Sequence, residues 1–265
     1  MFLPLKVDVP MSRLPLANWA LMAAITAGSF AGWMRPPVYD QLAGITVIRA
    51  EVPQGLKDDG LAAVDNLYGA VGARRNFTAN ETREFHPPAW KLPLLAISSV
   101  FVEQRTLLRG IFSLLGNLLF LWLFGNAVNY KFGHLPFLAL FFCSALVSGL
   151  AFYFATSNVP LSGASGAIMG ITGAFLVYFP RNDVTLAHIM SPWYGTFDVP
   201  SWAVILVWFV YDLMSFASGG QIGVAYISHL VGFLLGFGTA WLLAYRKIIG
   251  PAGHEETLLY LAGVS

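Results

Sequence analysis

Three polar side chains that could act together in catalysis stand in apolar stretches of this sequence. Ser165 lies between glycines in GASGAIMG (residues 163–170), His229 lies in VAYISHLVGFLLG, and Asn117 lies in LLGNLLFLWLFG. Hydroxyl, imidazole and carboxamide are the groups of a nucleophile, a general base and an oxyanion donor. If the fold brings them together, they suggest nucleophilic catalysis.

The composition indicates the solvent in which these groups lie. Of 265 residues, 57% are hydrophobic and 11% are charged, whereas soluble domains carry about 25% charged residues. The mean hydropathy is +0.65, so we predict an integral multi-pass membrane protein. The net charge of +1 gives no reason to expect a nucleic-acid partner, and the single Cys143 excludes an internal disulfide and a cysteine-rich metal site. No metal and no cofactor are expected.

Six apolar runs are long enough to cross a hydrocarbon core, which takes about 17 to 25 helical residues. They cover approximately residues 16–34, 110–129, 135–155, 162–179, 201–217 and 223–245. The segment 36–96 is rich in charges, prolines and glycines and is predicted to be one large loop outside the membrane, while 248–265 is a tail. The predicted fold is an all-α polytopic bundle of six transmembrane helices.

Basic residues in the short connections set the predicted orientation. With a cytoplasmic N-terminus, the short outer loops near 157–161 and 218–222 carry no basic residue. The residues that then fall inside are Lys6, Arg13, Lys131, Arg181, Arg246 and Lys247. Because long loops cross a membrane largely regardless of charge, we predict cytoplasmic N- and C-termini and an extracytoplasmic 36–96 loop.

This topology places the three polar residues at one depth. The second, fourth and sixth helices all enter from the outer face, and Asn117, Ser165 and His229 each lie about 5 to 10 Å along their helix from that end. A polar side chain in lipid is costly and usually faces the bundle interior, so the three are expected to face one another.

Small residues line one side of the fourth and the sixth helix. They recur every four residues, as Gly166, Gly170 and Ala174 in the fourth helix and as Gly232 and Gly236 in the sixth. Such spacing lets two helix backbones approach closely in a membrane, although it also occurs where it only packs helices. Because His229 precedes Gly232 by three residues, it lies on the packing face. The glycines expected to pack helices are Gly163, Gly166, Gly170, Gly232 and Gly236.

The motifs resemble those of rhomboid intramembrane serine proteases. GASGAIMGITGAFLVYFPR is similar to their fourth transmembrane helix, with the GxSG motif at Gly163 to Gly166. VAYISHLVGFLLG is similar to their sixth, with the AxxxHxxG pattern from Ala225 to Gly232, and LLGNLLFLWLFG resembles their second. Trp90-Lys91 resembles the Trp-Arg element that ends their first outer loop. The resemblance covers about residues 88–247 and implies a single rhomboid-like membrane domain over residues 1–265.

The resemblance implies a serine endopeptidase that cleaves transmembrane or membrane-adjacent segments of single-pass membrane proteins with a Ser-His dyad. Ser165 would attack the scissile carbonyl, and His229 would take its proton and later donate it to the leaving amine. The oxyanion would be held by the Asn117 amide, the Ser165 backbone N–H and Ser113, which stands where the family usually has a histidine. The short cytoplasmic ends suit a bacterial inner-membrane protein.

Two other functions remain open. Ser113 in place of the usual histidine suggests a catalytically inactive rhomboid-like protein that binds transmembrane segments. The glycine-rich helices, taken alone, also suit a small transporter or channel.

Asp212 is the acidic residue of the fifth apolar run. A charge at mid-bilayer costs about 2.5 to 3.5 kcal/mol, so Asp212, about five residues from the outer end, is expected to reach the interface. The resemblance implies that the fifth helix and the loop 217–222 form a substrate gate, so a structural or gating role is expected for Asp212. The second, fourth and sixth helices contain no acidic residue, so none of them offers an aspartate to orient the imidazole.

Overall fold

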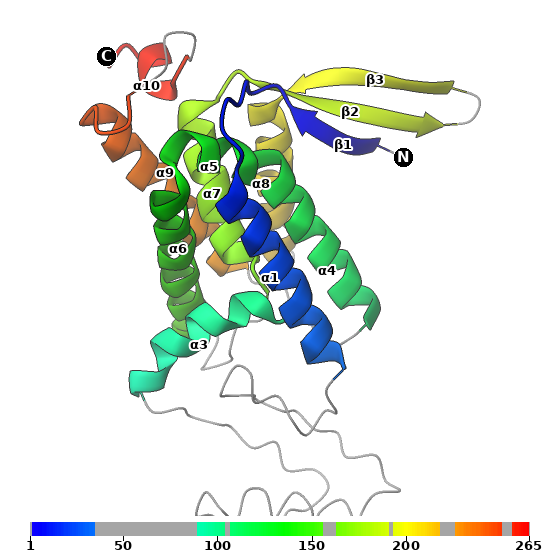
Figure 1. Cartoon of the computed structure of the whole chain (residues 1–265), viewed down its shortest axis with the longest axis vertical. Helices are drawn as coiled ribbons and strands as arrows, with labels where there is room; N and C mark the ends of the chain where they lie inside the picture. Colours follow the sequence, from blue (N-terminus) through cyan, green and yellow to red (C-terminus); the bar gives the residue numbers. More distant parts are fainter. Residues whose placement is uncertain are drawn as a thin grey trace, which may run out of the picture.

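The molecule is a bundle of helices with a small sheet at one end (Figure 1). The computed structural model describes residues 2–34, 89–103, 107–155, 163–190, 193–217, 226–250 and 256–264. Most of the predicted 36–96 loop lies outside these residues, as does part of the predicted 248–265 tail.

Helices lie in each of the six apolar runs. Their bounds are α1 Leu16–Trp33, α4 Leu107–Phe120, α5 Asn126–Phe132, α6 His134–Ala155, α7 Ser165–Tyr178, α8 Ser201–Ala217 and α9 Tyr226–Tyr245. A π-helical turn, η3 (Leu121–Gly125), joins α4 to α5 into one continuous helix. The shorter elements are α3 (Leu92–Ser98), between the 3-10 turns η1 (Ala89–Lys91) and η2 (Ser99–Phe101), and α10 (Leu258–Leu261).

Three helical stretches of the described ranges are long and apolar enough to cross a membrane. They are Gly110–Phe132, His134–Ala155 and Tyr226–Tyr245. α7 is shorter, with 14 residues. At 1.5 Å per residue it is about 21 Å long, whereas the hydrocarbon core is about 30 Å thick. The first residue of α7 can therefore lie below one membrane surface.

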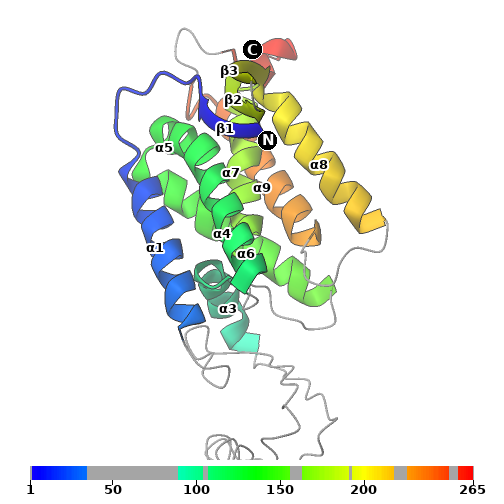
Figure 2. The same cartoon turned by 90° about the vertical axis from the view of Figure 1, so that its right-hand side faces the viewer.

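α7 is the central helix of the bundle, with α4, α6 and α9 around it (Figure 2). All of its residues are buried except Ser165 and Leu176, which keep partial exposure. A helix that is apolar on every side is typical of such a central position. Ser165 is thus the polar end of an otherwise enclosed helix.

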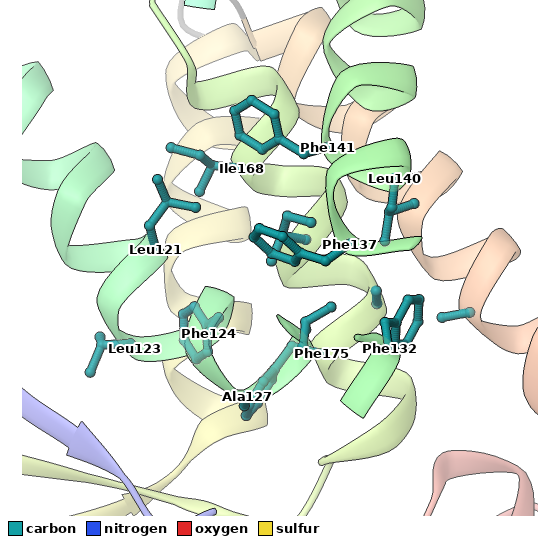
Figure 3. Packing of buried hydrophobic residues seen from close by; sticks show 14 of the residues in the cluster. Leu121, Leu123, Phe124, Ala127, Phe132, Phe137, Leu140, Phe141, Ile168 and Phe175 are labelled. Atoms are coloured by element: carbon teal, nitrogen blue, oxygen red, sulfur yellow. The ribbon is translucent and has the colours of Figure 1, made fainter. Parts of the chain in front are cut away.

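Aromatic side chains fill the space around α7. The rings of Phe124 in η3 and Phe175 in α7 lie 4.8 Å apart between centroids. Phe137 and Phe141 of α6 point into the same space (Figure 3), and all four side chains are fully buried. Since lipid tails are as apolar as these side chains, close packing rather than the hydrophobic effect holds such helices together.

The helix α1 docks through a buried amide. The side chain of Asn18 donates hydrogen bonds to the Leu121 carbonyl at 2.8 Å and to Oδ1 of Asn126 at 2.9 Å. Leu121 opens the π turn η3, and its carbonyl accepts both the backbone N–H of Asn126 within the helix and the side chain of Asn18 from α1. The turn thereby attaches α1 one helical turn beyond Asn117.

The all-α prediction was incomplete, because the structure contains a three-stranded antiparallel sheet in the order β1-β2-β3. β1 (Phe2–Val7) pairs with β2 (Asp183–Met190) from Phe2 opposite His188 to Val7 opposite Val184. β2 pairs with β3 (Trp193–Pro200) from Asp183 opposite Pro200 to Met190 opposite Trp193. The sheet joins the N-terminus to the connection between α7 and α8, and it lies at the opposite end of α7 from Ser165 (Figure 1).

Candidate active site

Ser165 is the first residue of α7, and the turn before it is held in place by backbone hydrogen bonds. Gly163 has φ +100°, a left-handed conformation that glycine adopts without strain. Its N–H donates to the carbonyls of Val102 at 2.9 Å and Ser99 at 3.1 Å. Because the N–H groups of the first helical turn lack intrahelical partners, the start of α7 presents backbone donors beside the Ser165 hydroxyl.

Glycines bring α7 and α9 into backbone contact. A Cβ on Gly232 would overlap the carbonyl oxygen of Gly166, and a Cβ on Gly236 would overlap that of Gly170. A Cβ on Gly166 would overlap the hydroxyl of Ser228. Such an approach is possible only where neither helix carries a side chain.

This contact brings the serine and the histidine onto adjoining turns. Gly166 follows Ser165, Ser228 precedes His229, and Gly166 and Ser228 touch. The Ser165 hydroxyl and the His229 imidazole are not hydrogen-bonded to each other in this structure. In an enzyme without bound substrate such a bond is often long and forms only in the substrate complex.

The imidazole has a carboxylate partner that the sequence did not predict for it. Nδ1 of His229 lies 2.7 Å from Oδ2 of Asp212 on α8, and the two side chains are 15% and 16% exposed. The sequence placed Asp212 at the membrane interface because only its distance from the helix end was considered. The acid in an otherwise apolar helix was the available signal, but its partner depends on how α8 packs against α9.

Two of the predicted oxyanion donors, the side chains of Asn117 and Ser113, lie against a second carboxyl group. The side-chain nitrogen of Asn117 on α4 donates to Oε1 of Glu103 at 2.5 Å. Glu103 is only 2% exposed, and a Cβ on Gly163 would lie 3.2 Å from its Oε2. Asn117 and the turn before Ser165 therefore share one buried carboxyl. Gly163 lies against Glu103 at this point, while the contacts with α9 come from the later glycines of α7.

Burial raises the pKa of the Glu103 carboxyl above its ordinary value of 4.5. The Ser113 hydroxyl, the Asn117 amide and the Ala164 backbone N–H lie close enough to lower that pKa in part, although Oε2 has no hydrogen bond of normal geometry in the described residues. Glu103 precedes the apolar run of α4, and no local sequence pattern indicates its contact with Asn117.

Removing the Glu103 charge is expected to stabilise the fold near neutral pH. Because its pKa is raised in the folded state, that state binds more protons than the unfolded state just above pH 4.5, so stability falls as pH rises through the folded-state pKa. Glu103→Gln keeps an oxygen acceptor for Asn117 and removes this loss. Thermal unfolding in detergent from pH 4 to 8 should give a variant that gains on the wild type as pH rises.

The matched control is Glu256→Gln, since Glu256 is half exposed and pairs with Arg181 at the surface. Exposed pairs of this kind contribute about 0 to 1 kcal/mol. Parallel stability curves for wild type and Glu103→Gln would contradict the effect of burial on Glu103.

A sequence model of the Rhomboid domain matches residues 100–246, which is more than half of the chain. The chain belongs to the rhomboid family. Together with the three long apolar helices, the match identifies an integral membrane protein of that family. No curated protein matches the chain. The rhomboid match includes all of α4 to α9, and thus Ser165, His229, Asn117, Asp212 and Glu103, whereas α1 precedes it.

Proposed function

We propose that this rhomboid-family protein is an intramembrane serine endopeptidase with Ser165 as nucleophile and His229 as general base and acid. The observation that supports the proposal best is the backbone contact between α7 and α9, because it brings the turn bearing Ser165 against the turn bearing His229. The partial exposure of Ser165 at the start of a buried helix adds to it. A nucleophile must be reachable while the rest of its helix stays fixed.

The reaction follows the order of other serine proteases. The Ser165 oxygen attacks the scissile carbonyl carbon while its proton passes to the His229 imidazole. The tetrahedral intermediate expels the amine, which takes that proton from His229. Water then attacks the acyl-enzyme with His229 again as base, releasing the carboxylic acid and restoring Ser165.

The oxyanion of the intermediate is assigned to the Ser165 backbone N–H, the Asn117 amide and the Ser113 hydroxyl. The side-chain amide nitrogen of asparagine carries two hydrogens, so Asn117 can donate one to Glu103 and the other to an oxyanion. Loss of one such donor typically costs about 10²- to 10³-fold in rate.

The proposed setting is a six-helix membrane domain with both termini in the cytoplasm and the site below the extracytoplasmic rim, in a bacterial inner membrane. Substrates of this site are single-pass membrane proteins, cut within or beside the transmembrane segment. Backbone held in helical hydrogen bonds cannot be presented to a nucleophile, so segments with small, helix-destabilising residues suit it best.

Covalent labelling of Ser165 tests the proposal without a known substrate. The purified full chain in detergent is incubated with a fluorophosphonate probe, and the modified residue is identified by peptide mass spectrometry. We expect labelling at Ser165 that is lost in His229→Ala, because a serine hydroxyl is only weakly nucleophilic without a general base. Equal labelling of wild type and His229→Ala, or no labelling of either, would contradict a working Ser-His pair.

A catalytically inactive rhomboid-family protein that binds transmembrane segments is the second candidate. It is favoured by the Glu103 carboxyl on Asn117, since a negative charge at this point opposes an oxyanion, and by Ser113 in place of the usual histidine. Binding of a single-pass segment by a chain that the probe does not label would support it.

A further inference from the structure

The pairing of His229 with Asp212 leaves one ring nitrogen free for Ser165. A neutral imidazole carries its hydrogen on one nitrogen and accepts at the other. Asp212 Oδ2 lies 2.7 Å from Nδ1 of His229, and a carboxylate can only accept. The pairing therefore selects the form of His229 with the hydrogen on Nδ1 and the accepting lone pair on Nε2.

The packing of α8 against α9 explains how Asp212 reaches the imidazole. The rings of Phe209 on α8 and Phe233 on α9 lie 5.5 Å apart between centroids. Phe209 precedes Asp212 by three residues and Phe233 follows His229 by four, so each pair lies on one helix face. The aromatic contact and the Asp212–His229 contact thus belong to one antiparallel seam between the two helices.

The rest of α8 offers the Asp212 carboxyl group no partner of opposite charge. α8 lies at the edge of the bundle (Figure 2) and contains no basic residue. Many of its side chains are exposed and apolar, among them Val207, Tyr211 and Met214. A carboxylate in such a helix is costly in a membrane and usually marks a functional pairing.

We propose that Asp212 is a positioning residue for His229, so that the Ser-His pair of the proposed protease works with a third, carboxylate member supplied by α8. The inference rests on the proposed function. Asp212 holds the imidazole by Nδ1–H and directs Nε2 to the Ser165 hydroxyl. When the Ser165 proton passes to Nε2, the carboxylate stabilises the imidazolium, and Asp212 itself takes no proton. The proton then leaves Nε2 with the departing amine.

Asparagine at position 212 separates this role from a simple tie between α8 and α9. Asp212→Asn keeps the size and the hydrogen bond, but its amide can donate to Nδ1 as well as accept, and it does not stabilise an imidazolium. We expect probe labelling of Ser165 by the full chain in detergent to fall by about 10²- to 10⁴-fold. Asp212→Glu restores the carboxylate and should recover most of the rate.

Asp198→Asn is the matched control, because Asp198 lies on the distant sheet and accepts from Thr185. It should label at the wild-type rate. Nitrogen-15 spectra of the histidine ring give a readout independent of activity: His229 should carry its hydrogen on Nδ1 in the wild type and lose that preference in Asp212→Asn. Thermal unfolding of each variant in the same detergent reports on the fold.

Three results decide the matter. If wild type labels at Ser165 and His229→Ala does not, but Asp212→Asn labels like wild type, the positioning role is wrong and the proposed function stands. If Asp212→Asn and Asp212→Glu lose labelling together with thermal stability, the contact is structural and the positioning role is again wrong. If wild type itself is not labelled, the proposed function and this inference both fail.

Discussion

Replacing Ser165 with alanine is expected to lower cleavage of a single-pass membrane substrate by about 10⁴- to 10⁶-fold. Ser165 is the proposed nucleophile. The hydroxyls of Ser148 and Ser228 also lie against Gly166, but both residues are fully buried, whereas Ser165 keeps partial exposure. The fold should be unchanged, because Ser165 is partly exposed and alanine is the best helix former. Cleavage is measured in liposomes on reporters whose single transmembrane segment carries small residues, and thermal unfolding is measured on the same preparations.

Ser98→Ala is the control for this measurement. The Ser98 hydroxyl donates to the Leu95 carbonyl within α3, so Ser98→Ala removes a serine hydroxyl that is bonded within its own helix. Cleavage by Ser98→Ala should match that of the wild type. If Ser165→Ala cleaves the reporters as fast as Ser98→Ala, Ser165 is not the nucleophile.

The helices of this rhomboid-family protein could be predicted from local sequence because a membrane imposes a simple rule. Every backbone polar group must find a partner inside its own segment, so an apolar run of sufficient length becomes a helix. The run 135–155 and α6, at His134–Ala155, differ by one residue at the start. The run 162–179 is long enough by count, yet α7 is shorter, since the turn at Gly163 is pinned to Val102 and Ser99 before the helix begins.

The sheet could not be predicted in the same way. β1 and β2 are separated by about 175 residues of sequence, and the pairing of Phe2 with His188 is a property of the whole fold. Each strand is short, and neither contains an alternating pattern strong enough to stand out beside the apolar runs. A sequence window contains no information on such a distant partner.

The residues of the candidate site likewise fall into those that a local sequence pattern indicates and those whose contacts depend on the whole fold. Ser165 and its neighbouring glycines lie in one helix, and His229 and its neighbouring glycines lie in another. Each set is a local spacing pattern, so the sequence alone indicated both. Asp212 lies 17 residues before His229 and Glu103 lies 14 before Asn117, and each contact crosses from one element to another. Whether an acid in a membrane protein turns to the interface or to a neighbouring helix depends on packing, which the sequence pattern did not supply.

Alanine at position 236 is expected to destabilise the fold by about 3 kcal/mol, the upper range for overpacking. Its Cβ would overlap the Gly170 carbonyl, which is backbone of the central helix and cannot turn aside as a side chain can. α9 would have to move away from α7, and this would also separate His229 from Ser165. Thermal unfolding in detergent should show the loss, and probe labelling of Ser165 should fall with it.

Gly238→Ala supplies the contrast, because a Cβ on Gly238 would have no atom within 4 Å. Both glycines lie in α9, two residues apart, so their helix propensity and their membrane depth are nearly the same. Alanine at 238 should be neutral or stabilise by about 0.5 to 1 kcal/mol, since glycine is a poor helix former. The two substitutions therefore change stability in opposite directions if the backbone contact with α7 controls the fold. Equal effects at 236 and 238 would mean that α7 and α9 are not in backbone contact, and the geometric support for a Ser165–His229 pair would be lost with it.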